Sequence, residues 1–207
     1  MAVRDTSGAW HYAAATITVV AAALHFSGQP EADALLAAEP LALLIGFVLD
    51  QQVPVQKAFS SPLELKRRLG RLDAVEIAAL DTGELEAVFA DKPALHRLPA
   101  AMARRVQELC AAVAEGYGGD AARVWTEAAD GPDLRKRLLA LPGIGEMKAG
   151  SLVAVVGKRL GAGPPGWEAV APQHPCLADV DSPEALLAYQ AAKRAHKAEL
   201  RAGRTHT

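Results

Sequence analysis

The chain has 207 residues, of which 51% are hydrophobic and 22% charged, and its formal net charge is −2 at pH 7. A chain of this length forms one compact unit or two small lobes and buries about 70% of its surface, so its core needs no disulfide or metal. The composition excludes disorder and collagen-like structure. The net charge excludes a general attraction to nucleic acid, so any basic surface must be local.

The abundance of small and aliphatic residues points to packed helices. Aromatic residues make up only 5% of the chain, and no segment alternates convincingly as a strand. The two cysteines, Cys110 and Cys176, fit neither a metal-binding knuckle nor a disulfide scaffold. We therefore predict an all-α fold in a reducing cytoplasm, with no metal or other cofactor.

An apolar run over residues 13–26 is the first feature along the chain. It is too short to span a bilayer, which takes about 20 residues. It is similar to a signal-peptide core with Ala21 and Ala23 as a cleavage pattern, but only Arg4 precedes it and Asp5 cancels that charge. We favour a cytoplasmic protein without a membrane segment.

Two helices are predicted next. The first covers residues 31–38 and is ended by Pro40. The second covers residues 41–52, LALLIGFVLDQQ, and is apolar on nearly every face until its last three residues, as expected for a helix in the middle of a bundle. Pro54 ends it.

Two further helix starts follow. Ser61, Pro62 and Glu64 form the pattern of an N-cap, a proline at the first helical position and a capping-box glutamate. Asp73 with Glu76 repeats the signal. A longer helix is predicted over residues 99–115, with one apolar stripe at Met102, Val106, Leu109 and Val113.

The segment LPGIG at residues 141–145 interrupts two later helical stretches. Its glycines permit positive φ angles and let another backbone come close, while Leu141 and Ile144 anchor a tight hairpin on either side of Gly143. The second helix is expected to start near Glu146, so its free N–H groups lie beside Gly145 and suit a phosphate. An ordinary helix corner without a ligand is the alternative.

Basic residues flank this hairpin. They could meet phosphates, or they could simply keep the helix faces solvated. They are Arg135, Lys136, Arg137, Lys148, Lys158 and Arg159.

Two motifs carry a family resemblance. LPGIGEMKA at residues 141–149 resembles the hairpin of the helix-hairpin-helix DNA glycosylases, which include endonuclease III, the adenine glycosylase and the alkyladenine glycosylases. LLIGFVLDQQVPVQKA at residues 43–58 is similar to that family's buried helix ending in a glutamine pair. The resemblance covers roughly residues 24–168. More narrowly, the arrangement resembles a small actinobacterial-type subgroup of this family that lacks the iron–sulfur cluster.

The resemblance implies a two-lobed helical bundle. A central lobe over residues 41–148 would carry the hairpin, and a second lobe would combine residues 1–40 with 149–207. A cleft between the lobes would receive an extruded nucleotide, and the partner would be duplex DNA with a damaged or mismatched base. The residues expected to bind it are Gln51, Gln52, Leu141, Gly143, Ile144, Gly145 and Lys148.

The glutamine pair supports this interpretation from the residues themselves. Gln51 and Gln52 end a buried helix, so their amides can stand at the mouth of a cleft and hydrogen-bond base edges or fill a gap in the base stack. A polar helix terminus without a ligand is the alternative.

The catalytic residues depart from the family pattern. Met147 occupies the position of the lysine of members that also cleave the backbone, and Lys148 is turned about 100° around the helix. The family aspartate is missing as well. Glu168, the nearest carboxylate to its expected position, and Asp50, directly before the glutamine pair, are the candidates, with Glu168 slightly favoured.

Isolated aromatic and histidine residues are less informative. Trp125 is expected in the core, whereas Trp167 is the better candidate for stacking on a base. His96, His174 and His196 have no ligand spacing and are expected at the surface.

The sequence thus predicts a monomeric, monofunctional DNA N-glycosylase of base excision repair, cytoplasmic and associated with the nucleoid. A non-catalytic DNA-binding protein that kept the hairpin is the first alternative. A helical protein whose hairpin contacts another protein is the second.

Overall fold

The computed structural model describes residues 3–4, 10–11 and 21–204, with side chains over residues 21–194. Most of the apolar run at 13–26 therefore lies outside the described residues. In the described part, the only strands are β1 (Val3–Arg4) and β2 (Trp10–His11), which pair antiparallel. All other regular structure is helical, so the predicted all-α class is confirmed.

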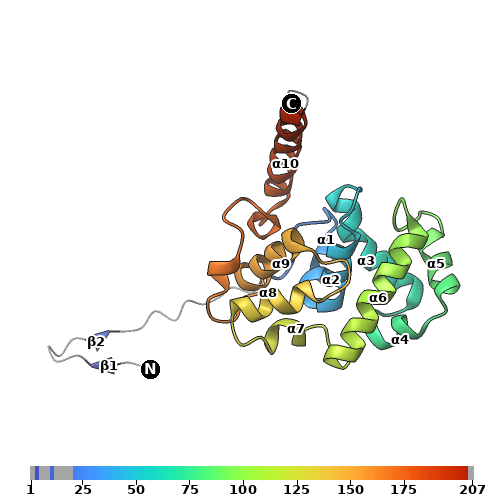
Figure 1. The fold of residues 1–207 in the computed structure, drawn as a ribbon, viewed down its shortest axis with the longest axis horizontal. Helices are drawn as coiled ribbons and strands as arrows, with labels where there is room; N and C mark the ends of the chain where they lie inside the picture. The colour runs from blue at the N-terminus through green and yellow to red at the C-terminus, as the bar shows by residue number, and fades with distance from the viewer. Residues whose placement is uncertain (1–2, 5–9, 12–20, 205–207) are drawn as a thin grey trace.

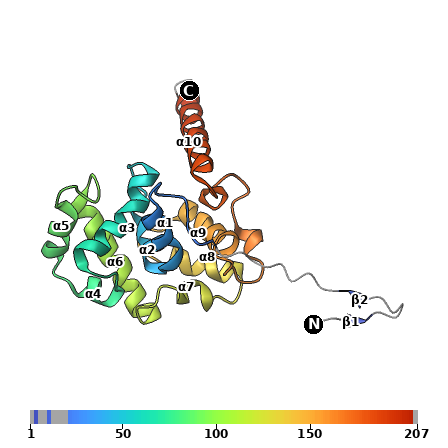
Figure 2. The same cartoon turned by 180° about the vertical axis from the view of Figure 1, so that it is seen from behind.

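Ten α-helices and two 3₁₀ helices make up the described part of the fold. In Figures 1 and 2, α2 lies between α4–α6 on one side and α8 and α9 on the other, and α10 projects from the body. No single described helix is both long and apolar enough for a membrane span, and α1 and α2 reach that length only as a pair bent by 115°. The helices are α1 (Pro30–Ala38), α2 (Pro40–Leu49), α3 (Val55–Leu69), α4 (Ala74–Ala79), α5 (Thr82–Ala90), α6 (Pro99–Tyr117), α7 (Arg123–Thr126), α8 (Gly131–Leu139), α9 (Glu146–Lys158), η1 (Trp167–Val170), η2 (Leu177–Asp179) and α10 (Pro183–Arg204).

Helix α2 is the centre of the core. Every residue from Leu41 to Leu49 is buried, as the uniformly apolar sequence predicts. The ring of Phe59 packs edge-on against Phe47, with centroids 5.2 Å apart. Gly46 is required there, because a Cβ at this position would lie 2.6 Å from the Phe59 ring.

The end of α2 differs from the prediction, which extended the helix to Gln52. The helix ends at Leu49 because Asp50 leaves the helical region, with φ −71° and ψ 69°. Gln52 then takes a left-handed conformation at φ 56°, which is uncommon for a residue with a side chain. Pro54 disfavours helical backbone at the residue before it, so the chain turns before α3 begins.

The predicted helix start at Ser61 is wrong. Helix α3 begins at Val55 and continues through Pro62 to Leu69. Ser61 is buried in mid-helix, where its hydroxyl lies 2.7 Å from the carbonyl oxygen of Lys57 and 2.8 Å from that of Leu95. The hydroxyl thus ties α3 to a distant loop and does not cap a helix.

The other start signals and the apolar stripe are confirmed. Asp73 accepts a hydrogen bond of 3.0 Å from the backbone N–H of Glu76 and caps α4. All members of the predicted stripe on α6 are buried. Cys110 beside it is buried too, and burial raises the pKa of its thiol to about 12, so it is an inert core residue. Trp125 is also in the core, as predicted.

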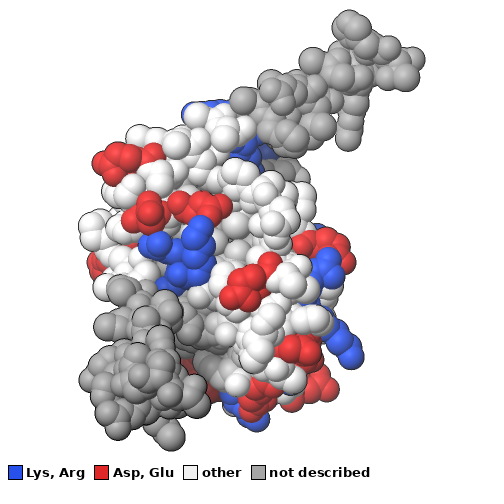
Figure 3. Space-filling view, turned by 90° about the vertical axis from the view of Figure 1, so that its left-hand side faces the viewer, with Lys and Arg blue, Asp and Glu red and all other residues white. Residues whose placement is uncertain are grey.

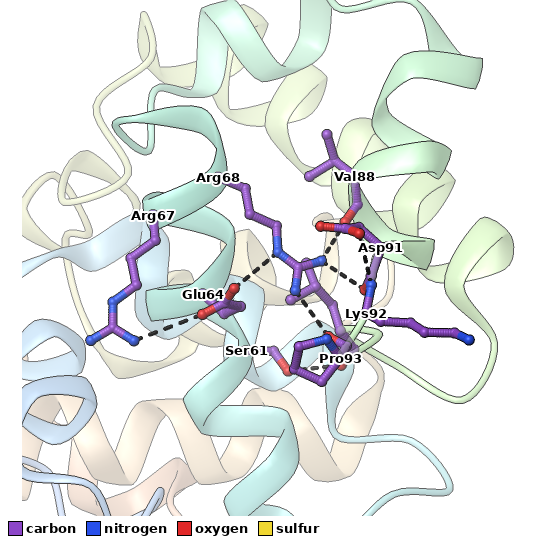
Figure 4. Close-up of polar contacts among 9 residues, drawn as sticks. Ser61, Glu64, Arg67, Arg68, Val88, Asp91, Lys92 and Pro93 are labelled. Carbon is purple, nitrogen blue, oxygen red and sulfur yellow. Dashed lines mark hydrogen bonds and ion pairs between the residues drawn. The ribbon is translucent and has the colours of Figure 1, made fainter.

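Arg68 fixes the loop that follows α5. Its guanidinium donates to the carbonyl oxygens of Val88, Asp91 and Pro93 at 2.7, 3.1 and 2.9 Å, and to Glu64 at 3.0 Å (Figure 4). Hydrogen bonds from a charged donor are among the stronger ones in proteins. The loop over residues 91–98 is thereby held against α3.

Helices α8 and α9 are in contact and are joined by the segment 140–145. α9 begins at Glu146, as predicted, and Leu141 and Ile144 are buried on either side of Gly143. The division into two lobes at residue 148 stays a prediction.

Candidate nucleic-acid interface

Two segments of the sequence meet at the end of α2: the glutamine loop, residues 50–53, and the hairpin turn, residues 141–145. A Cβ built on Gly143 would lie 3.2 Å from Val48, so the turn packs directly on α2. Lys148 joins the hairpin turn to the end of α2 just before the glutamine loop, because its Nζ donates to the carbonyl oxygens of Val48 at 3.3 Å and Gly143 at 3.2 Å. Motifs almost a hundred residues apart therefore share one surface.

The hairpin turn leaves backbone groups open. Gly143 has a φ of +81°, which favours glycine. Gly145 is exposed, extended at φ −94°, and no atom lies within 4 Å of the position its Cβ would take. No side chain caps the first turn of α9. Leu141 and Ile144 are buried, so in DNA binding they could act only by holding this backbone in place.

The glutamine loop is held by its own polar groups. Gln51 is half-buried, and its amide donates to the carbonyl oxygen of Val48 at 2.8 Å and accepts from Arg105 at 2.7 Å. Gln52 is exposed and accepts from Arg97 at 3.3 Å. The amide of Gln51 thus has partners within the protein and holds the loop, whereas Gln52 projects from it.

The buried side chain of His96 is hydrogen-bonded to the backbone of this loop. Its Nδ1 accepts the backbone N–H of Leu98 at 3.1 Å, so Nε2 carries the proton and donates to the carbonyl oxygen of Gln51 at 2.9 Å. Burial lowers the pKa of the ring, which favours the neutral form. The residue is 2% exposed, so its predicted surface position is wrong.

His174 is exposed, as predicted. The side chain of His196 lies outside the described residues.

Asp50 is the carboxylate of this region. Its side chain is 16% exposed, and one of its oxygens lies 3.7 Å from Nζ of Lys193 on α10. Burial lowers the pKa of Lys148 to about 8, with the charge of Asp50 acting in the opposite direction. Burial, together with the charge of Asp50, raises the pKa of Tyr189 to about 12. Asp50 therefore lies within electrostatic reach of both α9 and α10.

Glu168 does not join this group. It is exposed on η1, and it is not among the charges that act on Lys148. The indole of Trp167 packs on Gly157 and Gly163, where a Cβ would come within 2.3 and 2.4 Å of the ring. Gly157 is ten residues beyond Met147 on α9, roughly 15 Å along the helix axis, so Trp167 packs near the end of α9 away from the hairpin turn.

Three of the six cations predicted beside the hairpin have acidic partners. Arg135 pairs with Glu146, Lys158 pairs with Asp179, and Arg137 donates to Asp133 at 2.9 Å. Figure 3, which views the molecule from the left-hand side of Figure 1, shows acidic and basic groups interspersed on that face.

The cations of the glutamine loop come from elsewhere in the sequence. Arg97 lies in the loop that Arg68 holds, residues 91–98, and Arg105 lies on the exposed face of α6. Sequence reasoning missed both, as well as the role of His96. Nothing distinguishes these residues locally from ordinary surface positions.

Two hollows flank the glutamine loop. The hairpin hollow has a volume of about 430 Å³, and the α10 hollow has a volume of about 470 Å³. Among the described residues no three His, Cys, Asp or Glu side chains gather as a metal site. The hairpin hollow is lined by Gln51, Arg105, Gly143, Gly145, Glu146, Met147 and Lys148, and the α10 hollow by Val53, Pro54, Val55, Gln56, Gln190, Lys193 and Arg194.

Comparison of the chain with protein-family models, with curated proteins and with solved structures found no match. Functional inference therefore depends on the residues and on the geometry of the glutamine loop and the hairpin turn.

Proposed function

We propose that this protein binds duplex DNA and acts as a monofunctional DNA N-glycosylase in base excision repair. One observation carries the proposal: a half-buried carboxylate, Asp50, lies where the glutamine loop, the hairpin turn and α10 converge. A solvent-shielded carboxylate beside a surface with open backbone donors and cations suits chemistry on a sugar held by its phosphates.

The hairpin hollow supplies the binding role in this proposal. A phosphate at Gly145 would accept from the uncapped amides of the first turn of α9, where the helix dipole also favours negative charge. Arg105 and Lys148 line the same hollow. Because the chain as a whole carries a charge of −2, this local set has to supply the attraction to DNA.

Asp50 supplies the chemistry. Cleavage of an N-glycosidic bond develops positive charge on the sugar, which a nearby carboxylate stabilises directly or through a water that it orients. We prefer Asp50 to Glu168 because only Asp50 is shielded from solvent and adjoins the proposed binding surface. Its contact with the exposed Lys193 at 3.7 Å is a weak ion pair that DNA phosphates could displace.

The proposal does not include cleavage of the DNA backbone. Met147, at the position of the family's lysine, is 82% exposed and has no nucleophilic group. Lys148 points inward and its amine is bonded to two carbonyl oxygens. We expect no strong covalent adduct when the protein is mixed with an abasic-site duplex and borohydride. A strong adduct that disappears in Lys148→Ala would identify Lys148 as a nucleophile and contradict monofunctionality.

The deciding experiment is a single-turnover assay of base release from a panel of duplexes with damaged or mismatched bases, run beside a binding titration at several salt concentrations. The proposal predicts binding that weakens with salt, and release from at least one duplex.

A second candidate is a DNA-binding protein without catalysis. It is favoured by the observation that Asp50 is paired with Lys193. Salt-dependent binding without base release from any duplex would select this candidate. Absence of binding would exclude both.

A further inference from the structure

The α10 hollow lies beside the glutamine loop and next to Asp50. Val53, at the end of the loop, lines it, whereas Gln51 lines the hairpin hollow. Lys193 lines the α10 hollow and also approaches Asp50 to 3.7 Å. The carboxylate of Asp50 is therefore close to both hollows. The two hollows have different linings and so suit different ligands.

The lining of the α10 hollow combines three kinds of groups. The segment 53–55 contributes two valines and a proline, which form an apolar wall. Gln56 and Gln190 contribute amides, and Lys193 and Arg194 contribute exposed cations. The volume of about 470 Å³ is within the range of about 300–1,000 Å³ typical of small-molecule sites.

The two amides form a joined pair. Nε2 of Gln190 donates to Oε1 of Gln56 at 2.5 Å, across the gap between α3 and α10. Each amide has two N–H donors and a carbonyl that accepts twice. Nε2 of Gln56 and Oε1 of Gln190 have no other hydrogen-bond partner among the described residues. The joined pair thus keeps one donor group and one acceptor group without a partner in the described part of the protein.

A neighbouring donor and acceptor are what the hydrogen-bonding edge of a nucleobase requires. The apolar wall suits the face of the base, and the cations suit the phosphate attached to its sugar. No single class of simpler ligand uses all three: a free phosphate leaves the wall and the amides unused, and an apolar ligand leaves the amides and the cations unused.

We propose that the α10 hollow is a nucleotide-binding site in which Gln56 and Gln190 read the base and determine which base is accepted. In the setting of the proposed function this base is the one extruded from the duplex, with its glycosidic bond directed towards Asp50. The inference rests on the proposed function for that setting, but the binding of a nucleotide can be tested separately.

The first test uses free nucleotides. The side-chain NH₂ signals of Gln56 and Gln190 are assigned in a ¹⁵N-labelled full-length protein by their loss in Gln56→Ala and Gln190→Ala. The four 2′-deoxynucleoside 5′-monophosphates are then titrated into the millimolar range, with 2-deoxyribose 5-phosphate as the probe that lacks a base. We expect both signals to shift with at least one nucleotide and to stay in place with the sugar phosphate.

Alanine variants give the size of the effect. Gln190→Ala removes one partner of the pair and is expected to weaken nucleotide binding about tenfold, as for one or two lost hydrogen bonds. Gln173→Ala is the matched control, because Gln173 is exposed and makes only a 3.4 Å contact with the carbonyl oxygen of Ala171. Unmoved amide signals with every nucleotide, or equal affinity in all three proteins, would overturn the proposal.

The second test uses duplex DNA with a mispaired 2-aminopurine, whose fluorescence rises when the base leaves the stack. The wild type and Gln173→Ala should raise the fluorescence, and Gln56→Ala and Gln190→Ala should do so less while binding the matched duplex normally. Nucleotide binding without duplex binding would support the hollow and reject the proposed function. Base release that is unaffected in both glutamine variants would support the proposed function and reject the α10 hollow as the site that reads the base.

Discussion

The hairpin turn and the glutamine loop lie against each other but are built in opposite ways. The hairpin turn is anchored by buried apolar side chains, Leu141 and Ile144, and no atom lies within 4 Å of the Cβ position of Gly145. The glutamine loop is anchored by polar bonds from His96 and Arg105, and its strained residue, Gln52, has φ 56°. One segment offers unused donors, and the other has the side-chain amide and the carbonyl oxygen of Gln51 in use.

This difference separates two tasks. A turn with free amides can accept a phosphate without rearrangement, so its contribution should be to affinity. A loop that is held from several sides can keep a neighbouring side chain in a fixed place, which catalysis requires. Asp50 is the residue that the glutamine loop would hold, and backbone strain such as that at Gln52 is common near functional sites.

The largest effect is expected at Asp50. If a duplex is found from which the protein releases a base, Asp50→Asn should lower the single-turnover rate by about 10²- to 10⁴-fold, because a charge-stabilising or water-orienting group is lost. The affinity for DNA should change little. Base release leaves an abasic site in the strand, and alkali cleaves the strand there. The rate is measured by separating cleaved from intact strands after this alkaline treatment.

Glu168→Gln is the matched control for this experiment. It removes the same type of charge from an exposed position outside the interface, and its rate should stay near that of the wild type. A large loss in Glu168→Gln with a normal rate in Asp50→Asn would reverse the assignment and favour the sequence-based choice.

The next effect concerns affinity at the hairpin turn. Gly145→Val places a branched side chain over the open backbone, and the space around the residue and its negative φ allow the fold to stay intact. Binding of plain duplex DNA, followed by fluorescence anisotropy at low salt, should weaken about tenfold, roughly 1.4 kcal/mol.

Gly116→Val provides the control for Gly145→Val. Gly116 is exposed on α6 and also has nothing within 4 Å of its Cβ position. Equal affinities of the two variants, with both folded, would remove the hairpin turn from the interface.

A smaller effect is expected on stability at Gly143. Its φ of +81° and the 3.2 Å approach of Val48 make Gly143→Ala costly by about 1 kcal/mol in the free energy of unfolding, measured with urea. Gly145→Ala, with no positive φ and no close neighbour, should cost less. Equal losses would mean that the tight packing of the turn on α2 contributes nothing.

The two segments also differ in how well the sequence predicts them. The hairpin turn was predictable because its signals are local: apolar anchors, two glycines and the start of α9 at Glu146 all lie within a few residues. The glutamine loop was predicted as helix to Gln52, and its supports Arg97 and Arg105 were not expected. Those supports depend on where α6 and the preceding loop lie in space, which short-range periodicity does not report.

The false helix start at Ser61 has the same cause. The pattern of serine, proline and glutamate indicates a start when the segment is exposed, but here Ser61 is buried and bonded to the distant Leu95. Tertiary contact overrides the local signal. The sequence likewise left both Asp50 and Glu168 as candidates, with Glu168 slightly favoured, and their burial in the structure favours Asp50 instead.

The smallest expected effect is a pH dependence of stability that comes from the polar anchoring of the glutamine loop. The apolar anchors of the hairpin turn have no group that titrates. His96 is the anchor that titrates, and it faces two cations, Arg97 on its own loop and Lys57 on α3, which also lower its pKa. Protonation would place an N–H on Nδ1 opposite the N–H of Leu98, so the folded protein resists it.

The direction of the pH dependence follows from this. The ring has its ordinary pKa near 6.5 in the unfolded chain and a lower one in the folded protein, so the unfolded state takes up the proton first as the pH falls. The stabilising contribution is complete above about pH 6.5 and is lost as the pH falls below that value, until the folded protein is protonated as well. Urea unfolding at pH 7.5 and 5.5 should therefore show a larger loss of stability in the wild type than in His96→Gln, which does not titrate. His174→Gln, a change at an exposed histidine, should follow the wild type. Parallel curves for the wild type and His96→Gln would show that the glutamine loop does not depend on a neutral His96.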